Sequence, residues 1–557
     1  MEYSLLVKVY KALESTSKRL EKTEIISEFL KKTSKNEVKT IIYLLEGKVF
    51  PEWDKRKTSF STRLMIKAIA SASGKTPREI ELKLNKLGDL GLVAEEVLKT
   101  KVQATLSKKS LDVNKVFSNL QKLSTLEGRG TVNKKTALVI ELLTHSSPEE
   151  SKYIVKMVLE KLRIGIAQGI IRDTIAKAYS LNPKEIEKAA DITGDYGEVA
   201  ELAISNNLED IRLSPEKPLN SMLAIVAKDF DETFEALGKE VQFEYKIDGF
   251  RLQALKGKSI KIYTRRLENV TKQFPEIIEY LNKYISAHNF ILDAEAVAFD
   301  QKTGRHKPFQ TVSQRIKRKY NIEEMAKKFP VELNIFDIMY YNGESVTDKP
   351  LKERRRILES IVKQQKKKIV LTEKLVTTKS KEAEKFFKKS IKEGYEGLMA
   401  KNLESHYRPG RYVNGWMKIK RILDPLDVAI IKAEYGEGKR AGWLTSYTIA
   451  CKNKNNLLEL GKVSTGVKEK AIGLTYNELT KLLKPLIIEK KGKEVTVEPK
   501  IIIEVAYEEI QESPTYTSGY GLRFPRILRL RTDEKKIDEI DDLAKVIKVY
   551  NSQKGKK

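Results

Sequence analysis

The sequence predicts a multidomain protein with an all-helical N-terminal domain, a mixed α+β middle domain and a β-rich C-terminal domain. Its 557 residues exceed what one hydrophobic core usually holds, so about three or four domains are expected. Apolar residues follow helical spacing up to about residue 213, and short β-rich segments alternate with helices up to about residue 422. Strand patterns dominate after Asp424-Pro425. The predicted domains are therefore 1–213, 214–422 and 423–557.

The N-terminal domain contains an internal repeat. Pro-Arg-Glu-Ile-Glu from Pro77, followed by Gly-Asp-Leu-Gly, recurs 106 positions later from Pro183 as Pro-Lys-Glu-Ile-Glu, followed by Gly-Asp-Tyr-Gly. In each copy a proline begins one helix and the glycines precede the next, which predicts two equivalent helix N-termini. These ends could hold two backbone phosphates of duplex DNA, or the duplication could serve packing alone. The glycines concerned are Gly88, Gly91, Gly194 and Gly197.

The most informative motif of the middle domain is Glu-Tyr-Lys-Ile-Asp-Gly-Phe-Arg at residues 244–251. A lysine amine attacks phosphorus only when it is neutral, which desolvation or neighbouring cations favour. Gly249 permits a close approach to a ligand, and Arg251 offers a planar fork for phosphate or carboxylate. The motif therefore suits a lysine, Lys246, that holds a nucleotide covalently. A surface hairpin around Asp-Gly is the structural alternative.

Further clusters follow Lys246 along the chain. Arg265 stands at a strand end, Glu295 lies in an apolar strand, and Phe336 closes another strand. A carboxylate suits Mg²⁺ or a ribose, and an aromatic face suits a base. Two of these residues also have a purely structural interpretation. Glu295 could form a strand-end salt bridge, and Phe336 could be a core residue.

Two clusters complete this series. Glu396 precedes a glycine, and Lys418 and Lys420 alternate along a strand, so both lysines are expected on one face. Two ammonium groups on one face suit an α-phosphate and favour a neutral Lys246. The alternative for such a lysine pair is a solvated face.

Strand patterns at 427–432, 443–450 and 500–507 indicate about five strands in a small basic domain. This pattern is typical of an OB-type barrel, which is a frequent platform for nucleic acids. The formal charge of the whole chain, +28, makes a polyanion the first candidate partner. Lysine enrichment of a thermophilic proteome is the alternative source of that charge.

Composition also restricts the protein class. The single cysteine, Cys451, excludes an internal disulfide and a cysteine-cluster zinc site. The sequence has no run of about eighteen apolar residues and no basic-then-apolar leader at its start, so no membrane partner is expected. We expect a monomer in the reducing cytoplasm.

Taken in order, the motifs resemble those of enzymes that form a covalent lysyl-nucleotide, above all the ATP-dependent DNA ligases of the archaeal and eukaryotic type. The resemblance spans almost the whole chain and includes Arg-Phe-Pro-Arg at 523–526 with the segment 529–533. It implies a helical DNA-binding domain, a nucleotidyltransferase (ATP-grasp-like) adenylation domain and an OB-fold domain. The implied cofactors are ATP and Mg²⁺ or Mn²⁺, and the implied partner is nicked duplex DNA.

The resemblance also implies a role for each matching residue. Lys246 would be the nucleophile, with Glu244 reading the adenine amino group and Phe336 stacking on the base. The remaining implied contacts are Arg251 and Arg265 to ribose or phosphates, Glu295 to sugar or metal, Glu396 to metal, Lys418 and Lys420 to the α-phosphate, and Arg523, Arg526 and Asp533 to the leaving pyrophosphate.

Two positions depart from the family pattern. The arginine expected four residues before Trp416 is replaced by Tyr412, so either Arg411 supplies the contact or it is lost. The last motif ends Asp533-Glu-Lys535, with its lysine displaced by one position.

The predicted function is sealing of 5′-phosphate/3′-hydroxyl nicks in duplex DNA through a lysyl-AMP intermediate, in replication, recombination and repair. The alternatives are an RNA ligase or capping-type nucleotidyltransferase, and a catalytically silent DNA-clamping protein of the same fold. A sliding clamp is a further candidate partner, although Gln-Ala-Thr-Leu at 103–106 lacks the aromatic pair of a clamp-binding peptide.

Overall fold

The computed structural model describes the chain except residues 101–109, 127, 129, 308, 317, 319, 411, 422, 437–439, 441, 470–473 and 554–557. The described residues form two compact units. The first comprises Met1–Ile225, Gly249–Thr372 and Asn402–Trp416, and the second comprises Val226–Asp248, Glu373–Lys401 and Met417–Lys557. The chain therefore passes from the second unit to the first directly after Asp248, two residues beyond Lys246.

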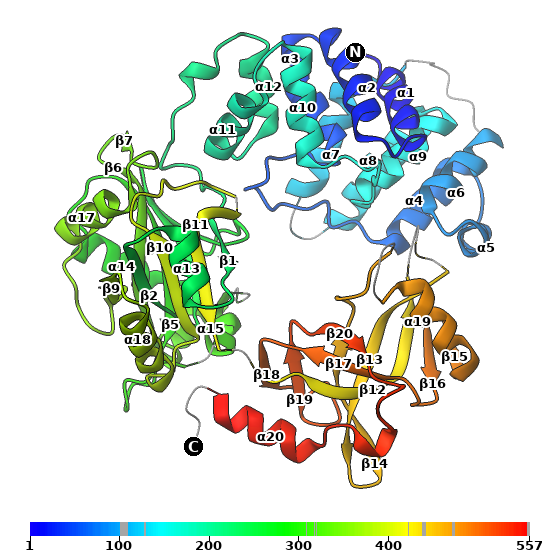
Figure 1. Cartoon of the computed structure of the whole chain (residues 1–557). Helices are drawn as coiled ribbons and strands as arrows, with labels where there is room; N and C mark the ends of the chain where they lie inside the picture. The colour runs from blue at the N-terminus through cyan, green and yellow to red at the C-terminus, as the bar shows by residue number, and fades with distance from the viewer. Residues whose placement is uncertain are drawn as a thin grey trace. The chain divides into compact units, whose positions relative to one another are not determined.

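The N-terminal region is helical, as predicted, and its helices share one apolar core from Tyr3 to Ala203 (Figure 1). The helices are α1 (Tyr3–Glu14), α2 (Arg19–Lys31), α3 (Lys35–Leu45), α4 (Thr62–Ser73), α5 (Pro77–Leu87), α6 (Leu90–Val97), α7 (Val113–Thr125), α8 (Thr131–His145), α9 (Pro148–Val158), α10 (Gln168–Ala178), α11 (Pro183–Thr193) and α12 (Tyr196–Ala203).

The sequence repeat forms two matching helix pairs, α5–α6 and α11–α12. Pro77 and Pro183 occupy the first turns of α5 and α11, where a missing amide hydrogen costs nothing. Both helices end at a glycine in the left-handed region, with φ of 71° at Gly88 and 65° at Gly194. The proline and the glycine recur in both copies, so α5 and α11 begin and end at equivalent residues.

The first unit also contains a six-stranded sheet in the order β4-β3-β5-β6-β7, with β8 pairing parallel to β6. Its strands are β3 (Phe250–Lys256), β4 (Ile260–Thr264), β5 (Phe290–Ala298), β6 (Val331–Tyr341), β7 (Glu344–Ser345) and β8 (Ile369–Leu371). The helices of this part are α14 (Pro275–Tyr284), α15 (Phe309–Ile316), α16 (Ile322–Lys328) and α17 (Leu351–Ile361). Register places Arg251 opposite Glu295 on β5, so two predicted site residues are cross-strand neighbours.

The second unit holds most of a five-stranded sheet in the order β1-β11-β10-β2-β9. Its strands are β1 (Leu223–Val226), β2 (Val241–Lys246), β9 (Lys374–Thr377), β10 (Gly397–Asn402) and β11 (Tyr412–Lys420). Helices α13 (Phe230–Leu237) and α18 (Ser380–Lys392) contribute side chains to the core of this sheet. Strand β2 is buried along its length until Lys246, so the sheet core delivers that lysine to a strand end.

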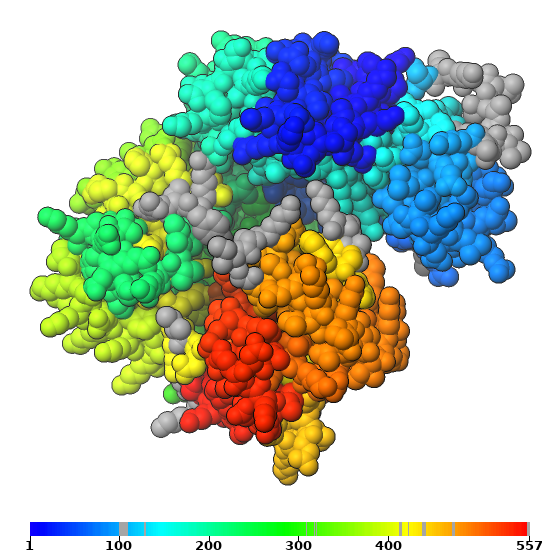
Figure 2. Space-filling model, turned by 45° about the vertical axis from the view of Figure 1, so that its right-hand side comes forward, coloured from blue at the N-terminus to red at the C-terminus, as the bar shows by residue number. Residues whose placement is uncertain are grey.

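The C-terminal region is strand-rich, as predicted. Its elements are β12 (Leu426–Tyr435), β13 (Leu444–Asn453), β14 (Asn456–Val463), α19 (Tyr476–Leu483), β15 (Ile487–Lys491), β16 (Glu494–Val497), β17 (Ile502–Ala506), β18 (Glu509–Glu512), β19 (Tyr520–Arg523), β20 (Arg526–Leu530) and α20 (Leu543–Ser552). Figure 2 shows the C-terminal residues, in red, at the surface beside residues coloured orange. Within the described ranges, no helix combines the length and apolar character needed to cross a bilayer.

Candidate active site

Lys246 lies at the C-terminal end of β2 and forms an ion pair with Glu396. The backbone joins the same two residues, because the Glu396 amide donates to the Lys246 carbonyl at 3.0 Å. Glu396 stands directly before β10, which neighbours β2 in the sheet. Adjacent strands thus hold the predicted nucleophile and a predicted metal ligand together across 150 positions of sequence.

A second lysine contacts the same carboxylate. Lys420 at the end of β11 places Nζ 3.7 Å from Glu396 Oε2 and 2.7 Å from Glu508 Oε2. Burial alone would raise the pKa of Glu396, but the charges of Lys246 and Lys420 outweigh it and hold that pKa well below its ordinary value. Glu396 is therefore a fixed negative charge at neutral pH.

Gly397 lets the carboxylate strand approach the lysine strand. Its φ is 142°, and a Cβ built there would lie 2.1 Å from the Ile419 carbonyl oxygen. Any side chain would push β10 away from β11 beside Lys420. The glycine after Glu396 is thus a geometric requirement of the site.

Lys418 lies on the same strand face as Lys420. Both lysines are half-buried and alternate with the buried residues Met417 and Ile419, as the strand periodicity predicts. The carbonyl of Lys418 accepts a hydrogen bond from the Ala227 amide at 3.0 Å. Two ammonium groups therefore share a face, and that of Lys420 contacts Glu396.

Glu244 is buried and contacts two polar side chains. Its Oε2 pairs with Lys401 Nζ at 2.6 Å, and its Oε1 accepts from Gln242 Nε2 at 2.6 Å. Lys401 is equally buried, so each charge compensates the other inside the sheet. Glu244 precedes Lys246 by two residues on β2, and Lys401 of β10 holds its carboxylate in an ion pair.

In the first unit, Arg251 forms a bidentate ion pair with Asp293. The two bonds measure 3.0 Å from Nε and 2.6 Å from Nη2, and Nη1 donates to the Met222 carbonyl at 2.7 Å. Burial opposes the charge on the guanidinium, but Asp293 overcomes this and raises the pKa of Arg251. The phenol of Tyr407 donates to the second oxygen of Asp293 at 2.8 Å.

Two aromatic rings lie beside this arginine. The guanidinium carbon of Arg251 is 5.3 Å from the centroid of Phe336 and 5.6 Å from that of Trp416. Phe336 and Trp416 meet edge to face at 6.0 Å. Trp416 is buried, whereas Phe336 is half-buried and keeps part of its ring accessible.

The other predicted residues of the first unit lie nearby or at the surface. Glu295 is half-buried on β5, and a Cβ at Gly249 would come within 2.9 Å of its Cγ and 2.5 Å of the Ala296 oxygen. Gly249 therefore serves a close approach between neighbouring strands. Arg265 follows β4 directly and is exposed, while its amide donates to the Arg251 carbonyl at 3.1 Å.

The C-terminal motif contributes one arginine near Lys246. Arg523 Nη1 lies 3.2 Å from Glu509 and 3.9 Å from Asp248, which belongs to the same motif as Lys246. Arg526 and Asp533 are exposed. Lys535, the lysine displaced by one position in the last motif, pairs with Asp427 at 2.6 Å. This ion pair lies within the strand-rich C-terminal region.

The four repeat glycines occupy two kinds of position. Gly88 and Gly194 end helices, while Gly91 and Gly197 are buried where helices meet. A Cβ at Gly91 would come 2.8 Å from the Lys152 oxygen, and one at Gly197 would come 2.8 Å from Tyr43. These contacts give the packing interpretation direct support.

The helix starts in the repeat are capped from within. Asp89 accepts from the Leu92 amide at 3.0 Å, and Asp195 accepts from the amides of Gly197 and Glu198. A phosphate at either helix end would have to share these amides with the capping carboxylate.

Two predictions fall outside the described residues: the substitute arginine Arg411 and the segment 103–106. Over the ranges that the structure covers, no group of three or more His, Cys, Asp or Glu side chains could hold a metal ion.

The predicted site residues did not include Asp293, Lys401 or Tyr407. Asp293 lies two positions before Glu295, and Lys401 lies five positions after Glu396. A charged residue within an apolar strand signals a buried partner, and that signal applied to both. Tyr407 carried no comparable signal, because nothing local marks a tyrosine whose partner is 114 positions away.

Comparison with known protein families covers most of the chain. The family model for an ATP dependent DNA ligase domain matches residues 221–420, the one for a DNA ligase N terminus matches 2–176, and the one for an ATP dependent DNA ligase C terminal region matches 440–534. A solved structure titled Pmar-Lig_PreS3 shares the fold, with a TM-score of 0.57 at 16% identity over 94% of this chain and 99% of that one.

Curated relatives match from end to end. The DNA ligase of Nanoarchaeum equitans is 43% identical over 100% of this chain and 99% of its own length. The DNA ligase of Thermococcus onnurineus is 41% identical over 99% of this chain and 98% of its own length. With three matching family models and such full-length relatives, the chain belongs to the ATP-dependent DNA ligase family.

Proposed function

We propose that this ligase seals 5′-phosphate/3′-hydroxyl nicks in duplex DNA through an AMP held on Lys246. The observation that carries the proposal is the Lys246–Glu396–Lys420 cluster, in which one carboxylate lies between two ammonium groups at neighbouring strand ends. Such a cluster can bind a triphosphate once its internal ion pairs exchange for contacts to the substrate.

The reaction comprises three phosphoryl transfers. The Lys246 amine attacks the α-phosphorus of ATP, a nitrogen–phosphorus bond forms, and pyrophosphate leaves. The nick's 5′-phosphate oxygen then takes AMP from the lysine, and the 3′-hydroxyl attacks the activated 5′-phosphate and releases AMP. Lys420, which contacts the same carboxylate as Lys246, would hold the α-phosphate. Lys418 shares its strand face and supports the same role at the α-phosphate.

Single carboxylates suit the divalent ion that the family implies. Mg²⁺ is commonly held by one or two carboxylates together with substrate phosphates. Glu396 and Glu295 would supply those carboxylates, and Mn²⁺ fits the same oxygen ligands. When bound, the ion neutralises charge on the phosphates.

We also propose the nucleotide contacts that the motifs imply. The half-buried ring of Phe336 supports stacking on adenine, and the exposed guanidinium of Arg265 supports a phosphate contact. Arg251 is already held by Asp293, so it contributes by supporting Phe336 as well as by facing the ribose. Glu244 would approach the adenine amino group with Lys401 balancing its charge. Arg523 is the member of the last motif that lies near Asp248.

The finer architecture is likewise proposed. Residues 423–557 would form an OB-type barrel, because β12 pairs with β17 through its first half and with β16 through its second, and a bulge lies between Ile430 and Lys432. The domain boundaries 1–213, 214–422 and 423–557 are proposed with it. A monomer in the cytoplasm is our inference from the chain's single, buried cysteine and its charge.

The test is sealing of a 5′-labelled, singly nicked DNA duplex with ATP and Mg²⁺, beside Lys246→Ala. We expect joined product from the wild type and none from the variant. A wild type that seals only nicked RNA, or forms no lysyl-nucleotide at all, would replace this proposal by an RNA ligase or a silent DNA clamp. Sealing by the variant would place the nucleophile elsewhere.

A further inference from the structure

The sheet that carries Lys246 has one apolar face and one polar face. The side chains of β2, β10 and β11 that enter the core shared with α13 and α18 include Phe243, Tyr245, Leu398, Ala400, Met417 and Ile419. Because side chains alternate along a strand, the residues between them lie on the opposite face. That face carries Gln242, Glu244, Lys246, Lys401, Lys418 and Lys420. The nucleophile therefore shares its face with a carboxylate and the counterion of that carboxylate.

Glu244 is held through both of its oxygens. Lys401 Nζ lies 2.6 Å from Oε2, and Gln242 Nε2 donates to Oε1 at 2.6 Å. The side chains of Glu244 and Lys401 are only 2% and 1% exposed. An ionised carboxylate accepts hydrogen bonds and cannot donate one. Glu244 is thus a fixed acceptor, two residues before Lys246 on the same face of β2.

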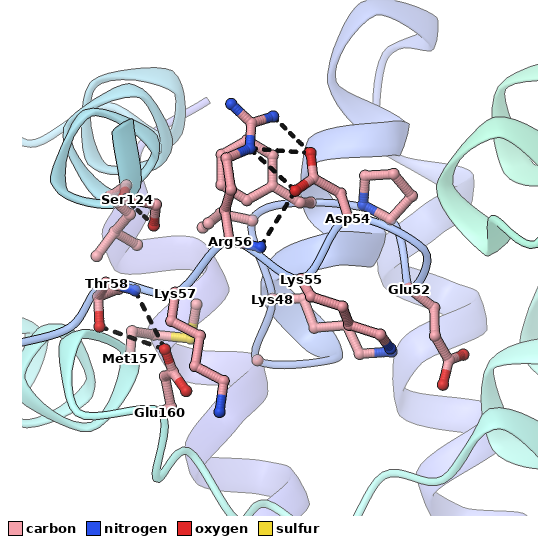
Figure 3. A pocket seen from close by; sticks show the side chains of 15 residues that line it. Lys48, Glu52, Asp54, Lys55, Arg56, Lys57, Thr58, Ser124, Met157 and Glu160 are labelled. Atoms are coloured by element: carbon pink, nitrogen blue, oxygen red, sulfur yellow. Dashed lines mark hydrogen bonds and ion pairs between the residues drawn. The ribbon is translucent and has the colours of Figure 1, made fainter. Parts of the chain in front are cut away.

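The Arg56–Asp54 pair of the helical region shows what burial adds to such a contact (Figure 3). Its bonds measure 2.9 and 3.0 Å, but 49% of the Arg56 side chain is exposed, so water can replace either partner at little cost. Glu244 lacks that access to water. A buried carboxylate without its counterion neutralises itself by taking up a proton, and the resulting carboxyl group can donate. Lys401 therefore keeps Glu244 an acceptor.

We propose that Lys401 is a positioning residue that makes this site choose adenine nucleotides over guanine nucleotides. The proposal rests on the proposed function, in which Glu244 reads the adenine amino group. Position 6 of adenine carries that amino group, which donates, whereas position 6 of guanine carries a carbonyl oxygen, which accepts. An ionised Glu244 attracts the first and repels the second. Lys401 acts on the base only through Glu244, and Gln242 supports it by holding the second oxygen.

The rate at which Lys246 is labelled by different nucleotides tests the proposal. The probes are ATP, GTP and purine riboside triphosphate, which carries hydrogen at position 6, and the readout is kcat/KM for lysyl-nucleotide formation. The wild type should prefer ATP to both. Lys401→Met removes the charge and should lower the ATP:GTP ratio of kcat/KM at least about tenfold, because a hydrogen bond to a charged group is lost. The preference for ATP over the purine analogue should shrink with it.

A purely structural role for Lys401 predicts a different result. Labelling would then slow equally with all three nucleotides and leave the ratios unchanged, which would overturn the proposal, as would a wild type that uses GTP as well as ATP. Arg315→Met is the matched control, because Arg315 is also 1% exposed and pairs with Glu276 at 2.9 Å. It should keep the wild-type ratios even where the rates fall. An equal loss of ATP preference in this control would also overturn the proposal.

Two more variants cover poor folding of Lys401→Met. Lys401→Arg keeps the charge and should retain most of the preference for ATP. Glu244→Gln/Lys401→Met removes both charges together, which a buried pair tolerates better than the loss of one partner. Its amide can donate to the guanine carbonyl, so its ATP:GTP ratio should also fall at least about tenfold. A wild-type ratio in this double variant would overturn the proposal.

Failure of the proposed function would look different. A wild type that forms no lysyl-nucleotide with ATP would remove the proposed function and this inference together. A wild type that labels Lys246 from ATP, with the same ATP:GTP ratio in Lys401→Met, would reject the role of Lys401 alone.

Discussion

The phenolic oxygen of Tyr407 connects Asp293 to the backbone of Met222. It donates to Asp293 Oδ2 at 2.8 Å and accepts from the Met222 amide at 3.1 Å. Since Arg251 binds the same carboxylate and the Met222 carbonyl, these four residues close a ring of hydrogen bonds. Tyr407 is fully buried, and its acidity is suppressed because burial raises its pKa.

Tyr407→Phe should weaken ATP binding more than it slows chemistry. The variant leaves one oxygen of Asp293 and the Met222 amide each short of a buried partner, which costs about 1–3 kcal/mol of unfolding free energy. Arg251 keeps its pair with Asp293, but that carboxylate is less firmly held without Tyr407. We therefore expect the KM for ATP in self-adenylation to rise about tenfold, with kcat changed less.

Tyr10→Phe is the matched control, because Tyr10 is also fully buried and donates one hydrogen bond, to the Leu44 carbonyl at 3.0 Å. It should lose comparable stability and keep its KM. A KM that rises equally in both variants would reduce the Tyr407 effect to general destabilisation.

Asp337, the residue that follows Phe336, forms a fully buried ion pair with Arg354. Their two contacts measure 2.7 and 2.9 Å, and neither side chain is exposed. Arg354→Leu should lower the unfolding free energy by about 3–5 kcal/mol, because it leaves an uncompensated carboxylate in the core.

Denaturant unfolding measures this loss, and Lys31→Ala is the control. Lys31 pairs with Glu28 at 2.6 Å, but both side chains are about half exposed, so the control should cost less than about 1 kcal/mol. If Arg354→Leu/Asp337→Leu is no more stable than Arg354→Leu alone, the explanation by an uncompensated charge is wrong.

Local sequence patterns predicted those parts of the site that strand periodicity determines. Lys418 and Lys420 share a face, because alternation along a strand fixes side-chain direction. The repeat predicted the helix starts at Pro77 and Pro183 because proline and glycine act through local backbone geometry.

Long-range pairing could not be predicted in this way. Lys401 pairs with Glu244 across 157 positions, and no local pattern selects one acid among the 77 in the chain. Likewise, the sequence could not decide whether Gly91 serves packing or phosphate binding. The close approach of the Lys152 oxygen, which favours packing, exists only once α6 and α9 meet.

The stabilising effect of Glu396 should depend on pH. Because Lys246 and Lys420 depress its folded pKa to about 2, the ionised carboxylate stabilises the fold above its unfolded pKa of about 4.3. That contribution falls as pH drops from about 5 toward 2. The difference in unfolding free energy between the wild type and Glu396→Gln should therefore be largest near pH 7 and shrink below pH 5.

Urea unfolding of the wild type and of Glu396→Gln at pH 7, 5 and 4 checks this. A difference that grows as pH falls would mean that Glu396 carries a raised folded pKa. Self-adenylation of Glu396→Gln at pH 7 should fall at least a hundredfold, since the carboxylate that pairs with the nucleophile and suits the metal is lost.

Gly397→Ala should disrupt sealing by moving the strand that bears Lys420. The added Cβ would lie 2.1 Å from the Ile419 oxygen, so β10 and β11 must separate beside the two lysines.

Gly343→Ala is the control: its φ is 99°, also unfavourable for alanine, but no atom lies within 4 Å of its Cβ. Both variants bear a backbone cost of about 1–3 kcal/mol. Only Gly397→Ala should also lose nick sealing, by at least tenfold, in assays run well below its unfolding temperature. Sealing that survives in Gly397→Ala would show that the position of Lys420 tolerates a shift of its strand, whereas loss in both variants would trace the effect to backbone strain alone.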